Sequence, residues 1–335
     1  MAARRVVLQG WFGMNNFGDD LLLEITLSHL LKTVDHIHID VIGEGKTRPP
    51  FLPASVGYLP RASRKWSWFR KRWLRSGCDW VLCGGSILKA DVLQRFIEPA
   101  CQVKKAGGRV FLHAIGLREH LDVTPELRRF MNLVDGSSVR EQEGWNLLSQ
   151  LGSVELVADP VFAMEMHSGD GHSGRVLIAL RGTEEAESYI DDFAKQIVSM
   201  KGEITSIDVL VCFPQQDIQI SKRLVKALDG MNVRLIDGIS AVEKANMVAA
   251  ADRVITMRLH PAIVALTAGV IPWVLAPEHK HRALMEDIGK QEYLLDWNQT
   301  EQALTELTDD SVDMEASRLQ GSRSLDLLTG WIADG

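Results

Sequence analysis

An arginine and a histidine two residues apart form the most informative chemical pattern in the sequence. The segment MRLHP (257–261) directly follows the apolar run Arg253–Thr256, which is typical of a buried strand. The guanidinium of Arg258 can bind a carboxylate or phosphate, and the imidazole of His260 can donate a proton near neutral pH. Pro261 suits the first turn of a helix, whose N-terminus also favours anions. We therefore interpret this segment as an anion site with an attached proton donor, in preference to a structural histidine.

Arg140 and Arg181 have a similar placement. Each directly follows an expected strand, Gly136–Val139 for the first and Arg175–Leu180 for the second. An arginine at the carboxyl end of a strand can bind a carboxylate or phosphate through two parallel hydrogen bonds. The alternative for Arg140 is a surface ion pair with a neighbour such as Glu143, and the same ambiguity holds for Arg181.

The segment PEHKHR (277–282) places several cationic groups, Lys280 among them, at another expected helix start. These groups could hold a phosphate. The two histidines lack the companion carboxylate or cysteine pattern that a metal site needs, so we predict no metal there.

Two loops rich in glycine follow other expected strands. GWFGMNNFGDD (10–20) is neither a GxGxxG motif nor a P-loop, and a tight turn is as good an explanation as a ligand site. CGGSILK (83–89) carries a double glycine, which permits close approach of a ligand or of the next helix to the backbone. The residues of these loops that would line a site are Gly13, Asn16, Gly18, Asp19, Gly84, Gly85 and Ser86.

The elements that position these residues alternate between short apolar runs and helical patterns, which predicts parallel sheets covered by helices. Asp19 or Asp20 would cap the first helix. In the first half we expect strands at 6–9, 38–42, 80–83, 109–114 and 136–139, with helices at 21–32 and 141–151. In the second half we expect strands at 175–180, 207–212, 233–236, 253–256 and 272–275, with helices at 185–201, 218–228, 241–251 and 261–268.

A polar, glycine-rich stretch at 166–174 separates the two arrays and predicts a domain boundary. We expect two doubly wound, Rossmann-like α/β domains, residues 1–168 and 175–335, that face each other across a cleft, with the last helix packed back on the first domain. In such sheets ligands bind outside the carboxyl ends of the strands.

Composition narrows the class of protein. The chain has 335 residues and a net charge of −7, a balance that does not indicate nucleic-acid binding. The four cysteines show no zinc spacing and indicate a reducing compartment. The start is too short in apolar residues for a signal peptide, and no stretch approaches the roughly 20 apolar residues of a membrane span, so we expect a cytoplasmic protein.

The segment Arg61–Arg75 is strongly basic, although the chain as a whole is acidic. It contains seven basic residues, no acidic residue, and the aromatic residues Trp66, Trp68, Phe69 and Trp73. Such a segment could bind an anionic membrane surface, stack on sugars or dock against the other domain. The alternative is an ordinary helix with some buried tryptophans.

The ordered set of segments resembles the polysaccharide pyruvyl transferase family. The resemblance is carried in turn by GWFGMNNFGDDLLLE, CGGSILKAD, SSVREQEGWNLLSQLG, VADPVFAM, RVLIALR, VITMRLHPAIVALTAGVIP and PEHKHRALMEDIG. It implies a fold similar to that of the two-domain GT-B glycosyltransferases. It also implies transfer of a pyruvyl group from phosphoenolpyruvate to a glycan, normally as a ketal across two sugar hydroxyls.

The resemblance also implies roles for residues. By their motifs, Arg258 and His260 would serve the donor, and Arg140 would help to bind its carboxylate or phosphate. Our own hypothesis for this chemistry makes His260 the general acid and adds Leu259, Arg181 and Lys280 to the donor-binding residues. The loops at Gly13–Asp19 and Gly84–Ser86 would lie on the acceptor side. No cofactor is implied beyond phosphoenolpyruvate as donor substrate, and the acceptor would be a cell-envelope glycan, free or lipid-linked.

Three departures from the family pattern fall in the first domain. Cys83 replaces the first glycine of a triplet, Lys89 stands where glutamine is common, and His113–Gly116 replaces a more glycine-rich run. They bear on the acceptor more than on the donor. Two alternative functions stay open, a glycosyltransferase that uses a nucleotide sugar and a non-catalytic glycan-binding protein on the same fold.

Overall fold

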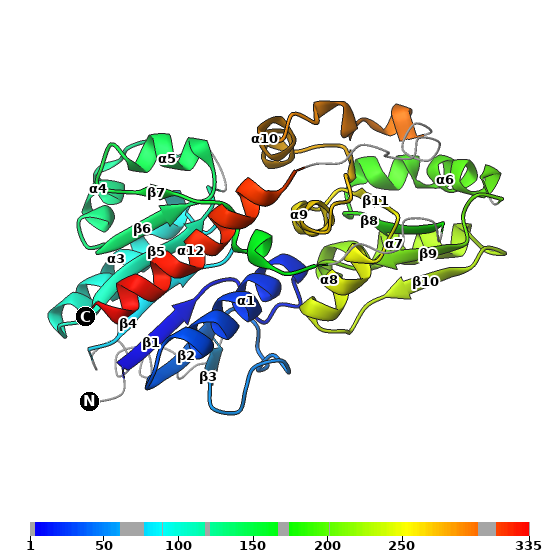
Figure 1. The fold of residues 1–335 in the computed structure, drawn as a ribbon. Coiled ribbons are helices and arrows are strands. Elements are labelled where there is room, and N and C mark those ends of the chain that lie inside the picture. Colours follow the sequence, from blue (N-terminus) through cyan, green and yellow to red (C-terminus); the bar gives the residue numbers. More distant parts are fainter. Residues whose placement is uncertain are drawn as a thin grey trace. The chain divides into compact units, whose positions relative to one another are not determined.

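Each half of the chain forms its own parallel sheet with helices on both faces in the computed structural model (Figure 1). The structure describes residues 4–60, 77–88, 90–117, 121–166, 174–200, 202–300 and 313–334. Unit 1 comprises Met1–Asn15, Asp19–Ala163 and Ser317–Gly335, and unit 2 comprises Asn16–Gly18 and Met164–Ala316. The predicted fold class of two doubly wound α/β domains is confirmed. The basic segment Arg61–Arg75, Lys89 and most of the polar stretch at 166–174 lie outside the described residues.

The sheet of unit 1 has seven parallel strands in the order β3-β2-β1-β4-β5-β6-β7. The strand order changes direction between β1 and β4, which is the topological switch point where ligands bind in doubly wound sheets. Both glycine-rich loops begin there, one after each of these strands. The strands are β1 Arg4–Gln9, β2 Ile37–Gly43, β3 Gly57–Pro60, β4 Asp79–Cys83, β5 Arg109–Ile115, β6 Gly136–Val139 and β7 Glu155–Leu156.

Alternating side chains of the central strands of unit 1 pack against helices on opposite faces of the sheet. Trp80 and Leu82 belong to the apolar cluster formed with α3 (Ala90–Lys105), α4 (Pro125–Met131) and α5 (Gln142–Leu148). Their neighbours Val81 and Cys83 belong to the cluster formed with α1 (Phe17–Thr33) and α12 (Glu315–Ala333). The C-terminal helix α12 runs across the strands beside α1 (Figure 1), and Trp331 stacks on Phe111 with ring centroids 5.6 Å apart. The short 3-10 helix Pro160–Ala163 ends the main run of this unit.

The sheet of unit 2 has six parallel strands in the order β10-β9-β8-β11-β12-β13. Its switch point lies between β8 and β11, which are followed by Arg181 and Arg258. The strands are β8 Arg175–Ala179, β9 Ser206–Leu210, β10 Val233–Ile236, β11 Arg253–Thr256, β12 Trp273–Leu275 and β13 Leu294–Leu295. The helices are α6 Glu184–Ser199, α7 Pro214–Ala227, α8 Ala241–Ala249, α9 Leu259–Thr267 and α10 His279–Asp287, with 3-10 turns at Gln291–Tyr293 and Trp297–Gln299.

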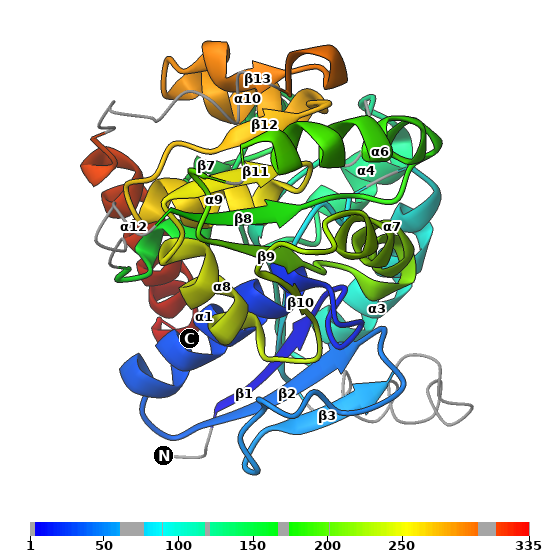
Figure 2. The same cartoon turned by 90° about the vertical axis from the view of Figure 1, so that its right-hand side faces the viewer.

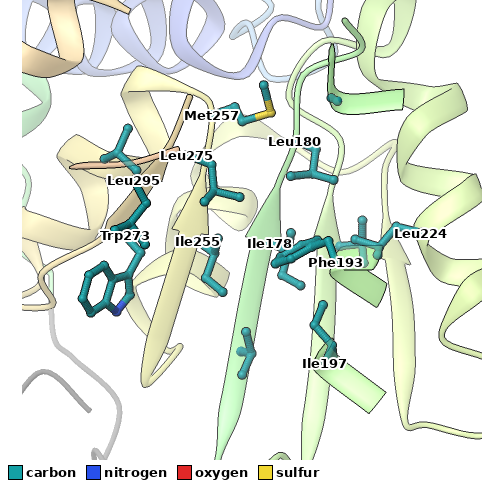
Figure 3. Packing of buried hydrophobic residues seen from close by; sticks show 14 of the residues in the cluster. Ile178, Leu180, Phe193, Ile197, Leu224, Ile255, Met257, Trp273, Leu275 and Leu295 are labelled. Carbon is teal, nitrogen blue, oxygen red and sulfur yellow. The ribbon is translucent and has the colours of Figure 1, made fainter. Parts of the chain in front are cut away.

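The core of unit 2 forms where α6 and α7 cover one face of this sheet. Ile178 and Ile255 lie side by side on neighbouring strands, and Phe193, Ile197 and Leu224 from the helices pack over them (Figure 3). Helices α8 and α9 lie on the opposite face of the sheet (Figure 2). The buried strands hold the carboxyl ends of β8, β11 and β12, and therefore the residues that follow them, in fixed positions.

Several boundaries differ from those expected. Helix α1 begins at Phe17, not Leu21, so the prediction that Asp19 or Asp20 caps it was wrong. Instead the Asp20 carboxylate accepts a hydrogen bond of 2.7 Å from the backbone N–H of Gly13 and closes the preceding loop. Helix α7 begins at Pro214 instead of Ile218, because proline suits a first helical position. Helix α5 ends at Leu148, three residues earlier than expected. Among the described residues no helix is long and apolar enough to cross a membrane.

Candidate active site

Arg258 occupies the N-cap position of α9 at the switch point of unit 2. Its backbone N–H donates to Thr256 Oγ1 at 2.8 Å, which fixes the turn out of β11. Its guanidinium donates to the fully buried carboxylate of Asp217 and, at 3.0 Å, to Gln216 Oε1. The Nε atom of Arg258 is buried and has no hydrogen-bond partner in the described part of the chain. A guanidinium held in position and still 17% exposed is suited to holding an anionic ligand.

His260 lies in the first turn of α9 and is half-buried. Gly18, which also belongs to unit 2, faces the imidazole ring of His260. A Cβ atom at Gly18 would overlap this ring. The adjacent Phe17 donates its backbone N–H to the carbonyl oxygen of Cys212 at 2.8 Å. The absence of a side chain at Gly18 therefore creates the space in which the imidazole sits.

Arg181 and Lys280 meet on one carboxylate. The Arg181 guanidinium contacts Glu278 Oε1, and Lys280 Nζ lies 2.9 Å from Glu278 Oε2. Burial alone would raise the pKa of Glu278, but the neighbouring Lys280 and Arg181 outweigh it, so the pKa is lowered and the group is a carboxylate. The structure thus brings two predicted cations together around an acid that the sequence did not single out.

His281 lies three residues after Glu278 and is fully buried beneath the cluster of Arg181, Glu278 and Lys280. Its Nδ1 accepts a hydrogen bond of 3.0 Å from the backbone N–H of Glu278. Burial lowers the pKa of His281 to about 3, with a further lowering by Lys280, so the ring is neutral near pH 7. An imidazole that accepts at Nδ1 and is neutral carries its proton on Nε2. His281 therefore helps to fix the start of α10.

Arg140 belongs to unit 1, unlike the other predicted cations. Its side chain is only 5% exposed, and it pairs with the buried Asp159, while Glu141 Oε1 lies 3.8 Å from its Nε. The alternative considered for Arg140, a surface ion pair with a neighbour such as Glu143, is wrong, because the guanidinium is buried and pairs with Asp159. Asp159 also accepts from the backbone N–H of Val161 at 3.0 Å, so Arg140 holds the chain after β7 in place.

The glycine-rich loop after β4 supports a cluster of polar side chains in unit 1. Gly84 and Gly85 both have positive φ, 82° and 67°. A Cβ atom at Gly85 would overlap the carboxylate of Asp19. A Cβ at Gly116 would lie 2.6 Å from Glu141 Oε1 and 2.9 Å from Ser86 Oγ. Glycine at these two positions therefore lets carboxylates and a hydroxyl gather at the ends of β4 to β6, and these groups can accept hydrogen bonds from sugar hydroxyls.

A buried histidine, His113, lies within β5, near the carboxyl end of that strand. His113 on β5 is 1% exposed, and neither ring nitrogen has a hydrogen-bond partner among the described residues. Burial lowers the pKa of His113 to about 3, with a further lowering by His29. The next residue, Ala114, has φ 46°, in the region that favours glycine, and its N–H donates to Ser138 Oγ at 2.9 Å. The replacement of the family's glycine-rich run thus coincides with a strained backbone and a buried imidazole.

The stability of unit 1 should fall in mild acid because of His113. Its folded-state pKa lies below the unfolded value of 6.5, so its contribution is fully present above pH 6.5 and is lost as the pH falls toward 3. The free energy of unfolding should decrease by up to about 1.4 kcal/mol per pH unit in that window. His113→Leu should flatten this slope in denaturant titrations from pH 7 to pH 5. Parallel pH profiles for the variant and the wild type would contradict this expectation.

Sequence reasoning missed the acidic and amide side chains that position the predicted cations. Asp217 and Gln216 hold Arg258, Asp159 holds Arg140, and Glu278 bridges Arg181 and Lys280. Pro214 was the available signal for Asp217, since a proline at the start of a helix puts Asp217 in its first turns. Asp159 lies within the segment VADPVFAM, which had no role assigned.

No group of three His, Cys, Asp or Glu side chains in the described ranges could hold a metal ion. His281 uses Nδ1 for a backbone hydrogen bond, and Glu278 is bound by two cations. His281 and Glu278 are thus engaged in positioning the start of α10.

Solved structures with a similar fold include several UDP-GlcNAc 2-epimerases. The enzyme from Methanocaldococcus jannaschii is 12% identical with a TM-score of 0.62, and 97% of this chain and 99% of that chain are covered. The enzyme from Neisseria meningitidis bound to UDP-GlcNAc is 11% identical with a TM-score of 0.62, covering 99% of each chain. The S. aureus MnaA–UDP structure is 10% identical with a TM-score of 0.63, covering 99% of this chain and 97% of that chain. At these identities the likeness shows the fold alone.

Family comparison is more specific. A comparison with curated protein sequences finds no match. The family model described as polysaccharide pyruvyl transferase matches residues 16–279. The matched range contains the glycine-rich loop after β4, the Arg140–Asp159 pair and the Arg258–His260 segment. The chain therefore belongs to the polysaccharide pyruvyl transferase family.

Proposed function

We propose that the protein transfers a pyruvyl group from phosphoenolpyruvate to hydroxyls of a cell-envelope glycan and forms a ketal. The observation that carries this proposal is the placement of Arg258 and His260 at the switch point of unit 2, within a chain of this family. Phosphoenolpyruvate carries a carboxylate and a phosphate, and positioned cations are what its recognition needs. Arg258, Arg181 and Lys280 supply them in unit 2.

The reaction needs a proton at the enol carbon of the donor. In the proposed mechanism His260 gives its proton to that carbon, and the resulting oxocarbenium-like centre is attacked by a sugar hydroxyl, which loses its proton. The phosphate then leaves with the electron pair of its C–O bond. A second hydroxyl attacks the same carbon and loses its proton, which closes the ketal. One phosphoenolpyruvate and one diol thus give one ketal and one inorganic phosphate.

The remaining site residues take supporting roles in this proposal. Leu259 lies between Arg258 and His260 and sets their spacing at the start of α9. In unit 1, the loops with Gly13, Asp19, Gly84, Gly85 and Ser86 bind the acceptor glycan, free or lipid-linked. Arg140, bound by Asp159, fixes the strand ends beside these loops.

A second candidate function is transfer or rearrangement of a nucleotide sugar. The observation that favours it is the shared fold with enzymes solved in complex with UDP or UDP-GlcNAc. The two functions call for different donors, so ligand binding separates them.

Phosphoenolpyruvate should bind the wild-type protein, and Arg258→Gln should weaken that binding. Loss of one charge-assisted hydrogen bond costs about 1.5–3 kcal/mol, which is roughly a 10- to 150-fold increase in Kd. Titration calorimetry with phosphoenolpyruvate and, separately, with UDP-GlcNAc makes the measurement.

The matched control is Arg223→Gln. Arg223 lies in the same unit, and its ion pair with Asp191 is exposed on both sides. This variant should bind phosphoenolpyruvate as the wild type does. If the protein binds UDP-GlcNAc and does not bind phosphoenolpyruvate, pyruvyl transfer is overturned in favour of the second candidate function, a reaction of a nucleotide sugar. A glycan ligand with no turnover of either donor would identify a non-catalytic binding protein.

A further inference from the structure

The cluster of Arg181, Glu278 and Lys280 differs from the other ion pairs of unit 2 in its geometry. One carboxylate bridges a guanidinium and an ammonium that follow two different strands, β8 and β12. Each cation contacts its own oxygen of the same carboxylate. This is the arrangement that a ligand carboxylate or phosphate would adopt between the same two cations.

The three side chains are accessible to a ligand. Arg181, Glu278 and Lys280 are 31%, 43% and 40% exposed, so an anion can reach the cations without unfolding the unit. Beneath them His281 is fully buried and holds the backbone of Glu278. The backbone of the site is therefore fixed, while the Glu278 side chain beyond it is held by ion pairs that are weak in water.

We propose that the carboxylate of Glu278 is an intramolecular stand-in for the anionic donor: it occupies the site between Arg181 and Lys280 in the free protein. When the carboxylate or phosphate of the donor binds these two cations, it displaces Glu278 from them. The inference rests on the proposed function in that Arg181 and Lys280 are donor-binding residues. The carboxylate of Glu278 keeps the two cations together in the free protein and lowers their affinity for any other anion. Glu278 is thus a specificity-determining residue: only a ligand with further contacts, such as those to Arg258, displaces it efficiently.

Glu278→Gln tests the proposal, because the amide keeps the size of the side chain and removes its charge. Binding of inorganic phosphate and of phosphoenolpyruvate should tighten by about three- to tenfold, a modest factor because the cluster is partly exposed and screened. Titrations at low ionic strength measure both Kd values. The control is Glu286→Gln, which makes the same charge change at an exposed position near the other end of α10 and should alter either Kd by less than about twofold.

The melting temperature gives a second readout. Without ligand, Glu278→Gln should melt slightly below the wild type, since Arg181 and Lys280 lose their partner. With saturating phosphate the difference should shrink or reverse, because the ligand binds the folded variant more tightly. A variant damaged in its fold would stay below the wild type at every phosphate concentration.

The two ligands separate this inference from the proposed function. Suppose that Glu278→Gln binds phosphate more tightly than the wild type, while neither protein binds phosphoenolpyruvate. This result would support the role of Glu278 as a stand-in and would overturn the proposal of pyruvyl transfer. Unchanged or weaker binding of both anions by Glu278→Gln, while the wild type binds phosphoenolpyruvate, would overturn the stand-in alone. If neither the wild type nor Glu278→Gln binds phosphate or phosphoenolpyruvate, the inference about Glu278 is overturned as well.

Discussion

His260→Ala should lower turnover by about 10²–10⁴-fold, the usual contribution of a positioned general acid. The proposed chemistry has one step that needs a proton on carbon, and His260 is the half-buried imidazole beside Arg258 at the unit 2 switch point. The measurement is phosphate release from phosphoenolpyruvate in the presence of a glycan that the wild type accepts. Binding of phosphoenolpyruvate should change far less than turnover, because the cations stay in place.

Gly18→Ala tests the same role without removing the imidazole. A Cβ atom at Gly18 would overlap the ring of His260, so the ring must move from its present position. Turnover should fall toward that of His260→Ala. Gly330→Ala is the matched control, since Gly330 also lies in a helix and its Cβ would meet nothing within 4 Å. Wild-type turnover in a folded His260→Ala protein would remove His260 from the chemistry.

The sequence was sufficient for the architecture because the strands are short, buried and separated by amphipathic helices. The strands Gly136–Val139, Val233–Ile236 and Arg253–Thr256 were predicted with their observed bounds. The edge strands β3 and β13 were not predicted, and α12 was predicted only as a last helix packed back on the first domain, without bounds. Strand β3 has only four residues and ends in Pro60, and α12 mixes charged and apolar residues along most of its length. Such elements are defined by what they pack against, which is not a local property.

Which cations share a cluster could not be predicted from the sequence. Arg181 and Lys280 are 99 positions apart, and only the pairing of β8 with β11 and of β11 with β12 places the strand ends that precede them on one sheet edge. The acids that hold Arg258 and Arg181 are also far from them in sequence. Asp217 is 41 residues from Arg258, and Glu278 is 97 residues from Arg181. Local patterns identified the cations as strand-end residues, whereas their partners followed from the topology.

The buried pair of Asp217 and Arg258 should matter for stability as well as for binding. Asp217→Ala should lower the free energy of unfolding by about 3 kcal/mol, because it leaves a guanidinium that is only 17% exposed without its carboxylate. It also removes the acceptor for the backbone N–H of Phe213, at 2.8 Å from Asp217 Oδ2. Chemical denaturation measures the change. The control is Asp191→Ala, whose exposed pair with Arg223 should contribute less than about 1 kcal/mol.

A double variant then separates folding from function. Replacing a buried ion pair by apolar residues of similar volume is often neutral or stabilising, whereas removing one partner is costly. Asp217→Leu combined with Arg258→Met should therefore regain most of the stability lost in Asp217→Ala and still bind phosphoenolpyruvate roughly 10- to 150-fold more weakly than the wild type. That result would mean that the pair exists to position a guanidinium for an anion, since folding can proceed without it. If Asp217→Ala is no less stable than Asp191→Ala, or if the double variant binds phosphoenolpyruvate as the wild type does, Arg258 is not held by Asp217 for donor binding.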